Sequence, residues 1–332
     1  MKSPLLIALI TALLTTLDGV AALEPSIRNE VDHAMSITAF SEPPTPAMRR
    51  QVAEIIRGKD DNAAAISLVS RQKHDGRWLD IADGVTNDYS AAAWCELRRL
   101  CGGREPLKVL AIGNSFSICL HKEWPRLAQE KGTELDLGTL FIGGCSLKRH
   151  AENIAATDKD GSKRQYRYDR NFLGAKRTTT TSVQEALTQE KWDVVTIQQA
   201  SHESWKRESY LPWATQVVEC VRRLAPQARL CIQETWSYCK GDARICDPET
   251  GGAGSWGIDQ RGMYERLHEN YLWLKPLVGA DGIIGVGTEI QRYREAGSGD
   301  DPVGTKGGDT IHLNSIGERL QAEVWQKFFF GE

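Results

Sequence analysis

The sequence lacks the motifs that would bind a metal, a nucleotide or a nucleic acid. It contains no Cys-x-x-Cys pair and no His-Glu-x-x-His run, so the common zinc sites are not predicted. No glycine-rich loop has the spacing of a dinucleotide fingerprint or a P-loop, which ranks a nucleotide-binding flavodoxin-like domain last. The 41 basic residues nearly balance the 44 acidic ones, and no basic run could follow a phosphate backbone. We therefore expect no cofactor, no metal and no nucleic-acid partner.

Long apolar runs are confined to the beginning of the chain. Residues 1–22 contain one early lysine, an apolar stretch over residues 5–17, and small residues Ala21 and Ala22 before the composition turns polar. This pattern is typical of a cleaved signal peptide. No later stretch approaches about 18 uninterrupted apolar residues, and no cysteine near the cleavage region could carry a lipid. The prediction is a secreted or periplasmic protein without stable membrane insertion.

Eight cysteines are present, which in an exported protein suggests disulfide bonds. Cys95 with Cys101, and Cys239 with Cys246, are close in sequence and lie in polar, loop-like surroundings, so one or two bridges are predicted there. The other four are expected to be small buried hydrophobic residues, because their neighbours are apolar. These are Cys119, Cys145, Cys220 and Cys231.

The composition of the chain changes near residue 105. Residues 23–104 are predicted to form a small helical segment, in which Thr45 and Pro46 have the pattern of a helix N-cap followed by a first-turn proline. The stretch QKHDGRWLDIADG in this segment resembles part of the helical-toroid domains of polysaccharide lyases, which hints at carbohydrate. The alternative is a solvated turn with Trp78 packed inward.

After residue 105, short apolar runs alternate with amphipathic helical stretches. This order predicts an α/β fold, a three-layer α/β/α sandwich around a five-stranded, mainly parallel sheet. A polar insert at residues 151–181 interrupts the alternation and is expected to be either a solvated loop or a rim of the site. The five strands are expected at residues 107–112, 135–141, 192–197, 228–235 and 282–286.

The first strand and the end of the chain carry residues suited to nucleophilic catalysis. Ser115 follows the first strand, where ligands bind in sheets of this type, although a serine there could merely cap the next helix. Asp309 and His312 lie three residues apart just before the last helix. Serine attack needs a histidine base, and the imidazole needs a carboxylate on its other nitrogen. Together the three residues predict a catalytic triad.

The segments IGNSFS, GGCSLKRH, WDVVTIQQAS and DTIHLN occur in this order, and with them the chain resembles the SGNH (GDSL-like) serine hydrolase superfamily. Within it the sequence looks like a poorly characterised bacterial branch of unknown function. The resemblance implies a flavodoxin-like SGNH domain over residues 105–332, with Ser115 as nucleophile, His312 as general base and later acid, and Asp309 as the orienting carboxylate. It also implies oxyanion donors from the backbone N–H groups of Ser115 and Gly144.

The third oxyanion donor departs from the superfamily pattern. Most members have an asparagine in a G-x-N-D motif where this chain has IQQAS. Gln198 is therefore favoured as the third donor over Gln199. The alternative is that Gln198 is a strand-end glutamine whose side chain bonds to local backbone. Asn114 replaces the aspartate of the commoner GDS motif. Substrate contacts are predicted for Asn114, Gln199, His202 and Trp236, with plain packing as the alternative for the tryptophan.

The predicted function is a secreted serine esterase that hydrolyses a carboxylic ester through an acyl-enzyme on Ser115. Export, the carbohydrate hint and the resemblance together favour O-acetyl groups on a carbohydrate or polysaccharide. A lipase-like or thioesterase-like hydrolase is the nearest alternative. A non-catalytic carbohydrate-binding protein on the same fold is the other, because the glutamine at the oxyanion position is unusual.

Overall fold

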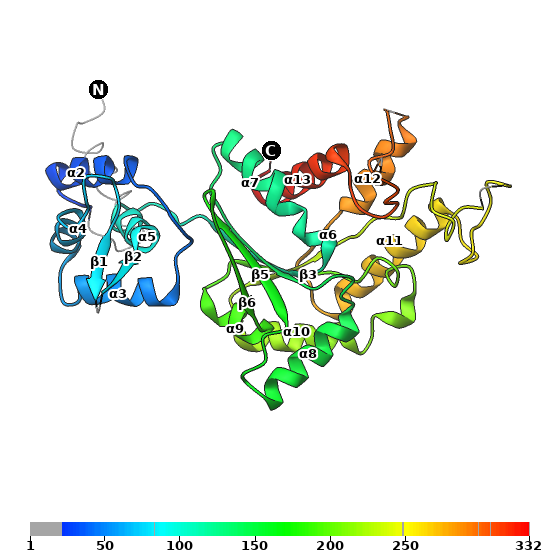
Figure 1. Cartoon of the computed structure of the whole chain (residues 1–332), viewed down its shortest axis with the longest axis horizontal. Helices are drawn as coiled ribbons and strands as arrows, with labels where there is room; N and C mark the ends of the chain where they lie inside the picture. Colours follow the sequence, from blue (N-terminus) through cyan, green and yellow to red (C-terminus); the bar gives the residue numbers. More distant parts are fainter. Residues whose placement is uncertain (1–21, 83, 248, 298, 306, 332) are drawn as a thin grey trace, which may run out of the picture. The chain divides into compact units, whose positions relative to one another are not determined.

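The computed structural model describes residues 22–82, 84–247, 249–297, 299–305 and 307–331 of the chain. The signal peptide predicted at residues 1–22 lies outside them, apart from its last residue. The chain divides into two compact units between Glu105 and Pro106 (Figure 1). Each unit has its own hydrophobic core.

The N-terminal unit is mostly helical, with one short hairpin that the sequence pattern does not predict. Thr45 caps its second helix by accepting a hydrogen bond from Met48 N, and proline follows at the first helical position. Trp78 is fully buried and donates its indole N–H to Leu68 O at 2.7 Å. The inward-packed tryptophan considered as an alternative is therefore what the structure contains. The elements are α2 (Pro25–Ser36), α3 (Pro46–Ile56), α4 (Asp61–Val69), β1 (Leu79–Ala82), β2 (Val85–Asp88) and α5 (Ser90–Leu100).

The C-terminal unit is built on a seven-stranded sheet with the order β6-β5-β4-β3-β7-β8-β9. All five predicted strands are present and pair in parallel, with β3 at the centre. From β3 the chain passes to β4 on one side and later to β7 on the other, and in open α/β sheets ligands bind where the strand order reverses. The strands are β3 (Leu107–Gly113), β4 (Leu135–Phe141), β5 (Tyr166–Phe172), β6 (Ala175–Thr181), β7 (Val194–Ile197), β8 (Arg229–Gln233) and β9 (Gly282–Ile284).

The prediction of five strands is wrong in number because the polar insert is not a loop. Its first part completes helix α8 (Leu147–Lys159), and the rest forms the antiparallel hairpin of β5 and β6 at one edge of the sheet. The charges that suggested solvent exposure are partly paired inside the protein. Arg170 on β5 is buried and bonds Asp136 at 2.8 Å and Glu190 at 3.1 Å. Charged and threonine side chains on β6 also protect an exposed sheet edge.

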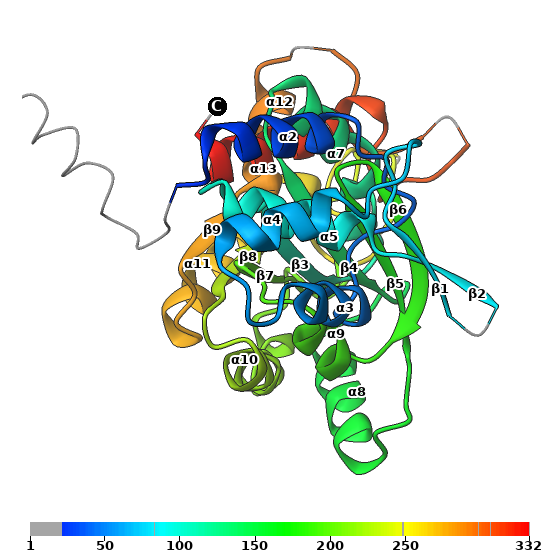
Figure 2. The ribbon, with the colours of Figure 1, turned by 90° about the vertical axis from the view of Figure 1, so that its left-hand side faces the viewer.

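Helices cover both faces of the sheet, which confirms the predicted three-layer α/β/α architecture. In Figures 1 and 2, α7 and α13 lie against one face, whereas α8, α9 and α10 lie against the other. Their contacts agree, since α7 packs on α13, and α10 packs on both α8 and α9. The helices of this unit are α6 (Ser115–Ile118), α7 (Leu120–Glu130), α8, α9 (Val183–Gln189), α10 (Trp213–Leu224), α11 (Gln260–Leu277), α12 (Val286–Glu295) and α13 (Ser315–Phe330).

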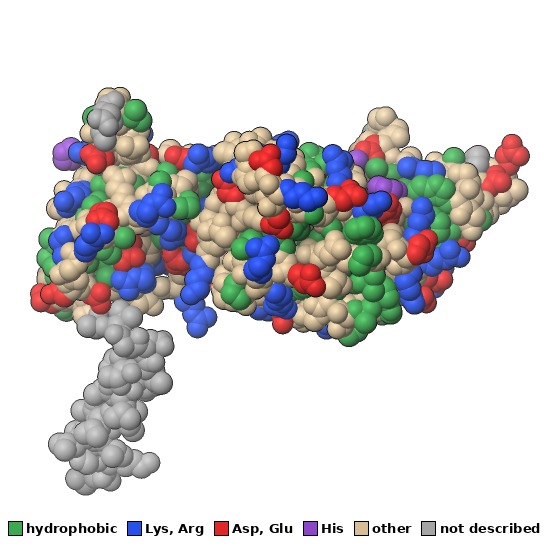
Figure 3. All heavy atoms as spheres, turned by 90° about the horizontal axis from the view of Figure 1, so that it is seen from below, with side chains coloured by type: hydrophobic (Ala, Val, Ile, Leu, Met, Phe, Trp, Pro, Cys, Tyr) green, Lys and Arg blue, Asp and Glu red, His purple; other side chains and the backbone are tan. Residues whose placement is uncertain are grey.

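None of the helices in the described part of the chain has both the length and the apolarity needed to cross a bilayer. On the face seen in Figure 3, basic and acidic side chains are interspersed.

The predicted disulfides are not formed, because none of the eight cysteines, all of which lie within the described residues, takes part in a disulfide. Cys95 is buried inside α5, and Cys101 follows the end of that helix. A helical rise of about 1.5 Å per residue separates them by about 9 Å, beyond the reach of a disulfide. Cys239 and Cys246 face different cavities. Nearness in sequence was therefore a poor guide to nearness in space.

Candidate active site

A tight turn at the end of β3 presents Ser115. Asn114 caps the short helix α6 by accepting a hydrogen bond from Phe116 N at 3.0 Å. The preceding residue, Gly113, has no room for a side chain, because a Cβ there would lie 2.1 Å from the Ser117 hydroxyl oxygen. Ser115 is the first residue of α6, so its backbone N–H has no acceptor within the helix. The turn thus places a hydroxyl and a donor N–H together at the carboxyl end of the central strand.

A closed loop just before α13 carries Asp309 and His312. Val303 pairs with Leu313 across its base, and Gly304 N donates to His312 O at 2.8 Å. Asn314 then caps α13 and also donates to Asp301 O at 2.7 Å. These hydrogen bonds hold the conformation of the loop that carries the His312 imidazole.

The two motifs meet although they are 197 residues apart in sequence. His312 Nε2 lies 2.9 Å from Ser115 Oγ, and His312 Nδ1 lies 2.6 Å from Asp309 Oδ2. Both distances are those of hydrogen bonds. This is the connectivity of a serine, histidine and aspartate triad, in which the carboxylate fixes the tautomer that leaves Nε2 free to accept the serine proton.

Asp309 is held in its ionised form. Partial burial raises the pKa of its carboxyl. Hydrogen bonds from the backbone N–H groups of His312 (3.0 Å) and Ile311 (2.8 Å), and the hydrogen bond with the His312 imidazole, lower it. The net result is a pKa below the ordinary value. Hydrogen bonds to the charged form of an acid stabilise that form. At neutral pH Asp309 is therefore a carboxylate that can orient the imidazole.

The predicted oxyanion donors, the backbone N–H groups of Ser115 and Gly144, lie on two turns that a hydrogen bond joins. Asn114 donates to Cys145 O at 3.0 Å and so ties the Ser115 turn to the glycine turn after β4. In that turn Gly144 is exposed and has a φ of +59°, which favours glycine. Neither Ser115 N nor Gly144 N is hydrogen-bonded to any described residue. This arrangement agrees with the oxyanion donors predicted for these two residues, whose role stays a prediction.

Gln198 has different contacts from those expected of an oxyanion donor. It is 1% exposed, accepts a hydrogen bond from the Ser117 hydroxyl at 2.9 Å, and donates to Asn114 Oδ1 at 2.7 Å. The amide thus lies beneath the Ser115 turn and supports Asn114. Both partners are side chains, so the alternative of a glutamine bonded to local backbone is not what the structure contains, and the oxyanion role of Gln198 stays a prediction.

Three of the four predicted substrate contacts are corrected by burial. Asn114 is 2% exposed and serves the turn described above. Gln199 is fully buried and its amide is used within the protein, accepting from Leu147 N and donating to Ser209 O, both at 2.9 Å. Trp236 is fully buried beneath the site, stacked on Phe116 at 3.9 Å between ring centroids. These side chains are not accessible to a substrate.

His202 is the fourth predicted contact and lies at the surface. Its side chain is 46% exposed, in the turn that follows β7. The nearest charged group is Glu203, with 3.9 Å between His202 Nε2 and the Glu203 carboxylate oxygen. A contact between His202 and substrate stays a prediction.

Sequence reasoning missed the segment that holds the Asp309 and His312 loop in place. Trp236 donates its indole N–H to Ile311 O at 2.9 Å, and Cys239 N donates to Thr310 O at 3.0 Å. The Thr310 hydroxyl donates to Asp242 at 2.7 Å. No spacing in the sequence signals these bonds, because they join residues about 70 positions apart.

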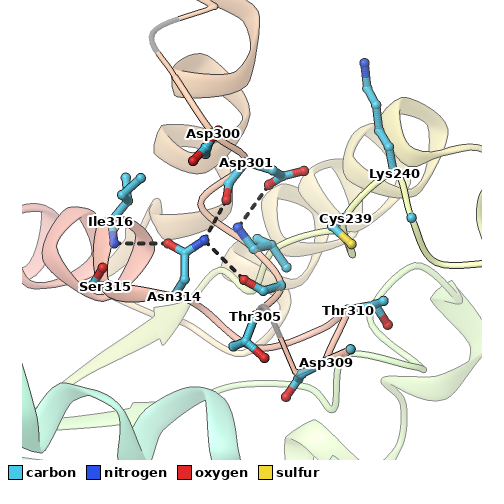
Figure 4. A pocket seen from close by; sticks show the side chains of 14 residues that line it. Cys239, Lys240, Asp300, Asp301, Thr305, Asp309, Thr310, Asn314, Ser315 and Ile316 are labelled. Atoms are coloured by element: carbon cyan, nitrogen blue, oxygen red, sulfur yellow. Dashed lines mark hydrogen bonds between the residues drawn. The ribbon is translucent and has the colours of Figure 1, made fainter.

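A cavity of about 740 Å³ adjoins the triad loop, and Asp309 forms part of its lining (Figure 4). Asn314 lies inside it, with bonds to Ile316 N and to the backbone of Asp301. Lys240, Cys239 and Asp300 also line it. Among the described residues, no group of three or more histidine, cysteine, aspartate or glutamate side chains is arranged to hold a metal.

The first prediction concerns Gly113. Substitution by alanine is expected to lower the free energy of unfolding by about 1 to 3 kcal/mol, because the new Cβ overlaps the Ser117 hydroxyl and must displace the turn. Urea unfolding measures the change. Gly161→Ala is the matched control, since a Cβ there has no neighbour within 4 Å. Equal stability of the two variants would contradict the steric argument.

The second prediction tests the role of Asn114 with the residue found in the commoner GDS motif. Asn114→Asp keeps the acceptor for Phe116 N but loses the donor to Cys145 O, and it sets a carboxylate oxygen against that carbonyl. We expect kcat for ester hydrolysis to fall by about tenfold or more, since the glycine turn loses its tie to Ser115. Unchanged kcat would show that the tie is dispensable.

Comparison with known proteins gives a family and a structural relative. The family described as a domain of unknown function (DUF4886) matches residues 108–332. The chain belongs to the DUF4886 family. A crystal structure of a DUF4886 family protein from Bacteroides uniformis is 30% identical, with a TM-score of 0.60 over 69% of this chain and 84% of that one. The predicted membership of a poorly characterised branch is thereby confirmed.

Two further solved structures are similar to this DUF4886 protein at lower identity. A family 3 carbohydrate esterase from Clostridium thermocellum is 13% identical, with a TM-score of 0.38 over 67% of this chain and 94% of that one. A carbohydrate esterase family 3 protein from Talaromyces cellulolyticus is 15% identical, with a TM-score of 0.41 over 68% and 97% of the two chains. A search of curated proteins gives no match.

Proposed function

We propose that this protein is a serine esterase that hydrolyses a carboxylic ester through an acyl-enzyme on Ser115. The observation that carries the proposal is the unbroken hydrogen-bonded chain from Ser115 Oγ through the His312 imidazole to the Asp309 carboxylate. A protein that only binds carbohydrate has no need of this chain. The proposal is supported by the backbone N–H groups of Ser115 and Gly144, which have no hydrogen-bond acceptor among the described residues and would serve as the oxyanion donors that acyl transfer requires.

In the first half of the reaction, Ser115 Oγ attacks the ester carbonyl carbon while its proton passes to His312 Nε2. The carbonyl oxygen becomes an oxyanion that accepts hydrogen bonds from the N–H groups of Ser115 and Gly144. Asp309 stabilises the imidazolium from the Nδ1 side. The bond between the carbonyl carbon and the alcohol oxygen then breaks, and the alcohol leaves with the proton from Nε2.

In the second half, water takes the place of the alcohol. His312 Nε2 removes a proton from the water, whose oxygen attacks the acyl carbon and forms a second oxyanion in the same position. The bond to Ser115 Oγ breaks, the serine regains its proton from His312, and the acid leaves. One water is consumed per ester, and no further reactant is required.

The substrate proposed is an O-acetyl group on a carbohydrate or polysaccharide. The side chains of His312 and Asp309 are 38% and 35% exposed, so the triad is open to solvent and can admit an ester carried on a bulky alcohol. The signal peptide predicted at residues 1–22 supports export, and with it contact with polysaccharide outside the cell.

The proposal is tested by acetate release from p-nitrophenyl acetate and acetylated xylan, together with labelling by a fluorophosphonate. We expect hydrolysis, and a covalent adduct that peptide mass spectrometry locates on Ser115. His312→Ala is the control, since it keeps the hydroxyl but removes its base and should abolish labelling. Absence of hydrolysis, or an adduct on another serine, would overturn the proposal.

A further inference from the structure

Three aromatic rings form a cluster on the loops that follow β7 and β8. Trp205 and Trp256 stack with 5.6 Å between ring centroids and an angle of 25° between ring planes. Tyr238 lies 5.7 Å from Trp256. Both tryptophans are only partly buried. In an open α/β sheet these loops surround the ligand site, because they leave the carboxyl ends of the strands.

Three cations lie over these rings. Lys206 Nζ is 5.2 Å from the centre of Trp205 and 5.9 Å from that of Trp256. The Arg244 guanidinium carbon is 4.6 Å from the centre of Tyr238, and that of Arg266 is 5.8 Å from the centre of Trp205. Tyr238 is itself buried, with 1% of its surface exposed, and lies under Arg244. We call the accessible members of this set the basic aromatic face, and they are Trp205, Lys206, Arg244, Trp256 and Arg266.

The positive charge of the basic aromatic face is only partly neutralised. Asp242 pairs with Arg244, to which it is joined by several hydrogen bonds. Lys206 and Arg266 form no ion pair with any described residue. Cations held over aromatic rings lose little solvation and are fixed in position, so they can meet an anion with little reorganisation.

Hydrogen bonds connect the basic aromatic face with the triad loop. In the sequence, Tyr238 lies between Trp236 and Cys239. These two residues donate hydrogen bonds to Ile311 O and Thr310 O on that loop. Asp242, the partner of Arg244, accepts from the Thr310 hydroxyl. The Tyr238 hydroxyl is 3.0 Å from the Ser201 hydroxyl, which joins the loop carrying Trp205 to the same segment. A ligand on this face would therefore lie beside the triad loop.

We infer that the basic aromatic face binds the carboxylates of an acidic saccharide, so that the esterase acts on esters carried by uronic acid-containing chains. A cation lies over each ring of the cluster, and a cation without an ion-pair partner favours an anionic ligand over a neutral one. Guanidinium and ammonium groups recognise carboxylates through charge-assisted hydrogen bonds. This inference rests on the proposed function for its hydrolytic part, whereas binding of the acidic saccharide can be measured without turnover.

The test is calorimetric titration of the Ser115→Ala full-length protein with an oligogalacturonate and with a neutral xylo-oligosaccharide of equal length. We expect tighter binding of the acidic ligand, weakened by added salt. Lys206→Gln with Arg266→Gln, in the same background, keeps long side chains but removes both charges. It should raise the Kd for oligogalacturonate by about tenfold or more.

Arg104→Gln with Lys131→Gln is the matched control, because both residues are exposed and neither belongs to the basic aromatic face. It should leave the Kd unchanged. Equal binding of the two saccharides, or an unchanged Kd after loss of Lys206 and Arg266, would overturn the inference. The proposed function would still stand in that case if the wild-type protein hydrolysed p-nitrophenyl acetate. Selective binding by a protein that hydrolyses no ester would instead support the inference and overturn the proposed function.

Discussion

Replacing Ser115 by alanine is expected to lower kcat/KM for ester hydrolysis by about 10⁴-fold or more. In the proposed mechanism the hydroxyl forms the acyl-enzyme, and its hydrogen bond to His312 Nε2 gives its proton an acceptor. The folded structure should be unaffected, because alanine removes one partly exposed atom. Steady-state kinetics and thermal unfolding measured on the same preparation check the two halves of this expectation.

Ser162→Ala is a suitable control for the loss of a serine hydroxyl, since Ser162 is exposed and bonds only its neighbour Asp160. It should keep the wild-type kcat/KM. Hydrolysis that survives the Ser115 substitution at a tenth of the wild-type rate or more would rule out the acyl-enzyme.

Replacing Asp309 by asparagine is expected to lower kcat by about 10⁴-fold, although the side chain keeps its shape. The amide can present an N–H where the carboxylate accepts a hydrogen bond from His312 Nδ1. The imidazole is then driven to the tautomer whose Nε2 carries hydrogen and cannot take the serine proton. The backbone N–H groups of Ile311 and His312 also lose a charged acceptor. Steady-state kinetics with p-nitrophenyl acetate give the effect.

The same substitution predicts a pH dependence of stability. The folded-state pKa of Asp309 lies below its ordinary value, so its contribution to the free energy of unfolding is fully present above the ordinary carboxyl pKa. That contribution is lost as the pH falls through the lowered pKa. Urea unfolding of wild type and Asp309→Asn should therefore differ at neutral pH and converge in acid. A difference that grows in acid would contradict the sign.

The sequence identified the strands of the parallel sheet and the three residues of the triad for physical reasons. The five parallel strands are buried apolar runs, which form a strong local pattern. Ser115 could be predicted as the nucleophile because it lies at a strand exit. His312 could be predicted as the base because it is three residues from a carboxylate. The sheet topology then brings the two ends of the domain together.

The contacts of polar side chains could not be predicted in the same way. Gln198 bonds Asn114 and Ser117, and Gln199 bonds Leu147 and Ser209, through long-range pairings that no local pattern encodes. The β5 and β6 hairpin was missed because its charges suggested solvent, although Arg170 is paired in the interior. The prediction of bridges failed because a helix separates two cysteines that are close in sequence.

The closed loop at residues 303–313 makes the base and its carboxylate a single local unit, whereas the nucleophile comes from a different part of the chain. The hydrogen bonds from Gly304 N to His312 O and from Thr305 N to Asp309 O lie inside this unit. Amide hydrogens of Gly304 and Thr305 should therefore exchange with solvent in one concerted opening. Such an opening would withdraw the imidazole and the carboxylate from Ser115 together, so the base and its orienting group would be lost in one step.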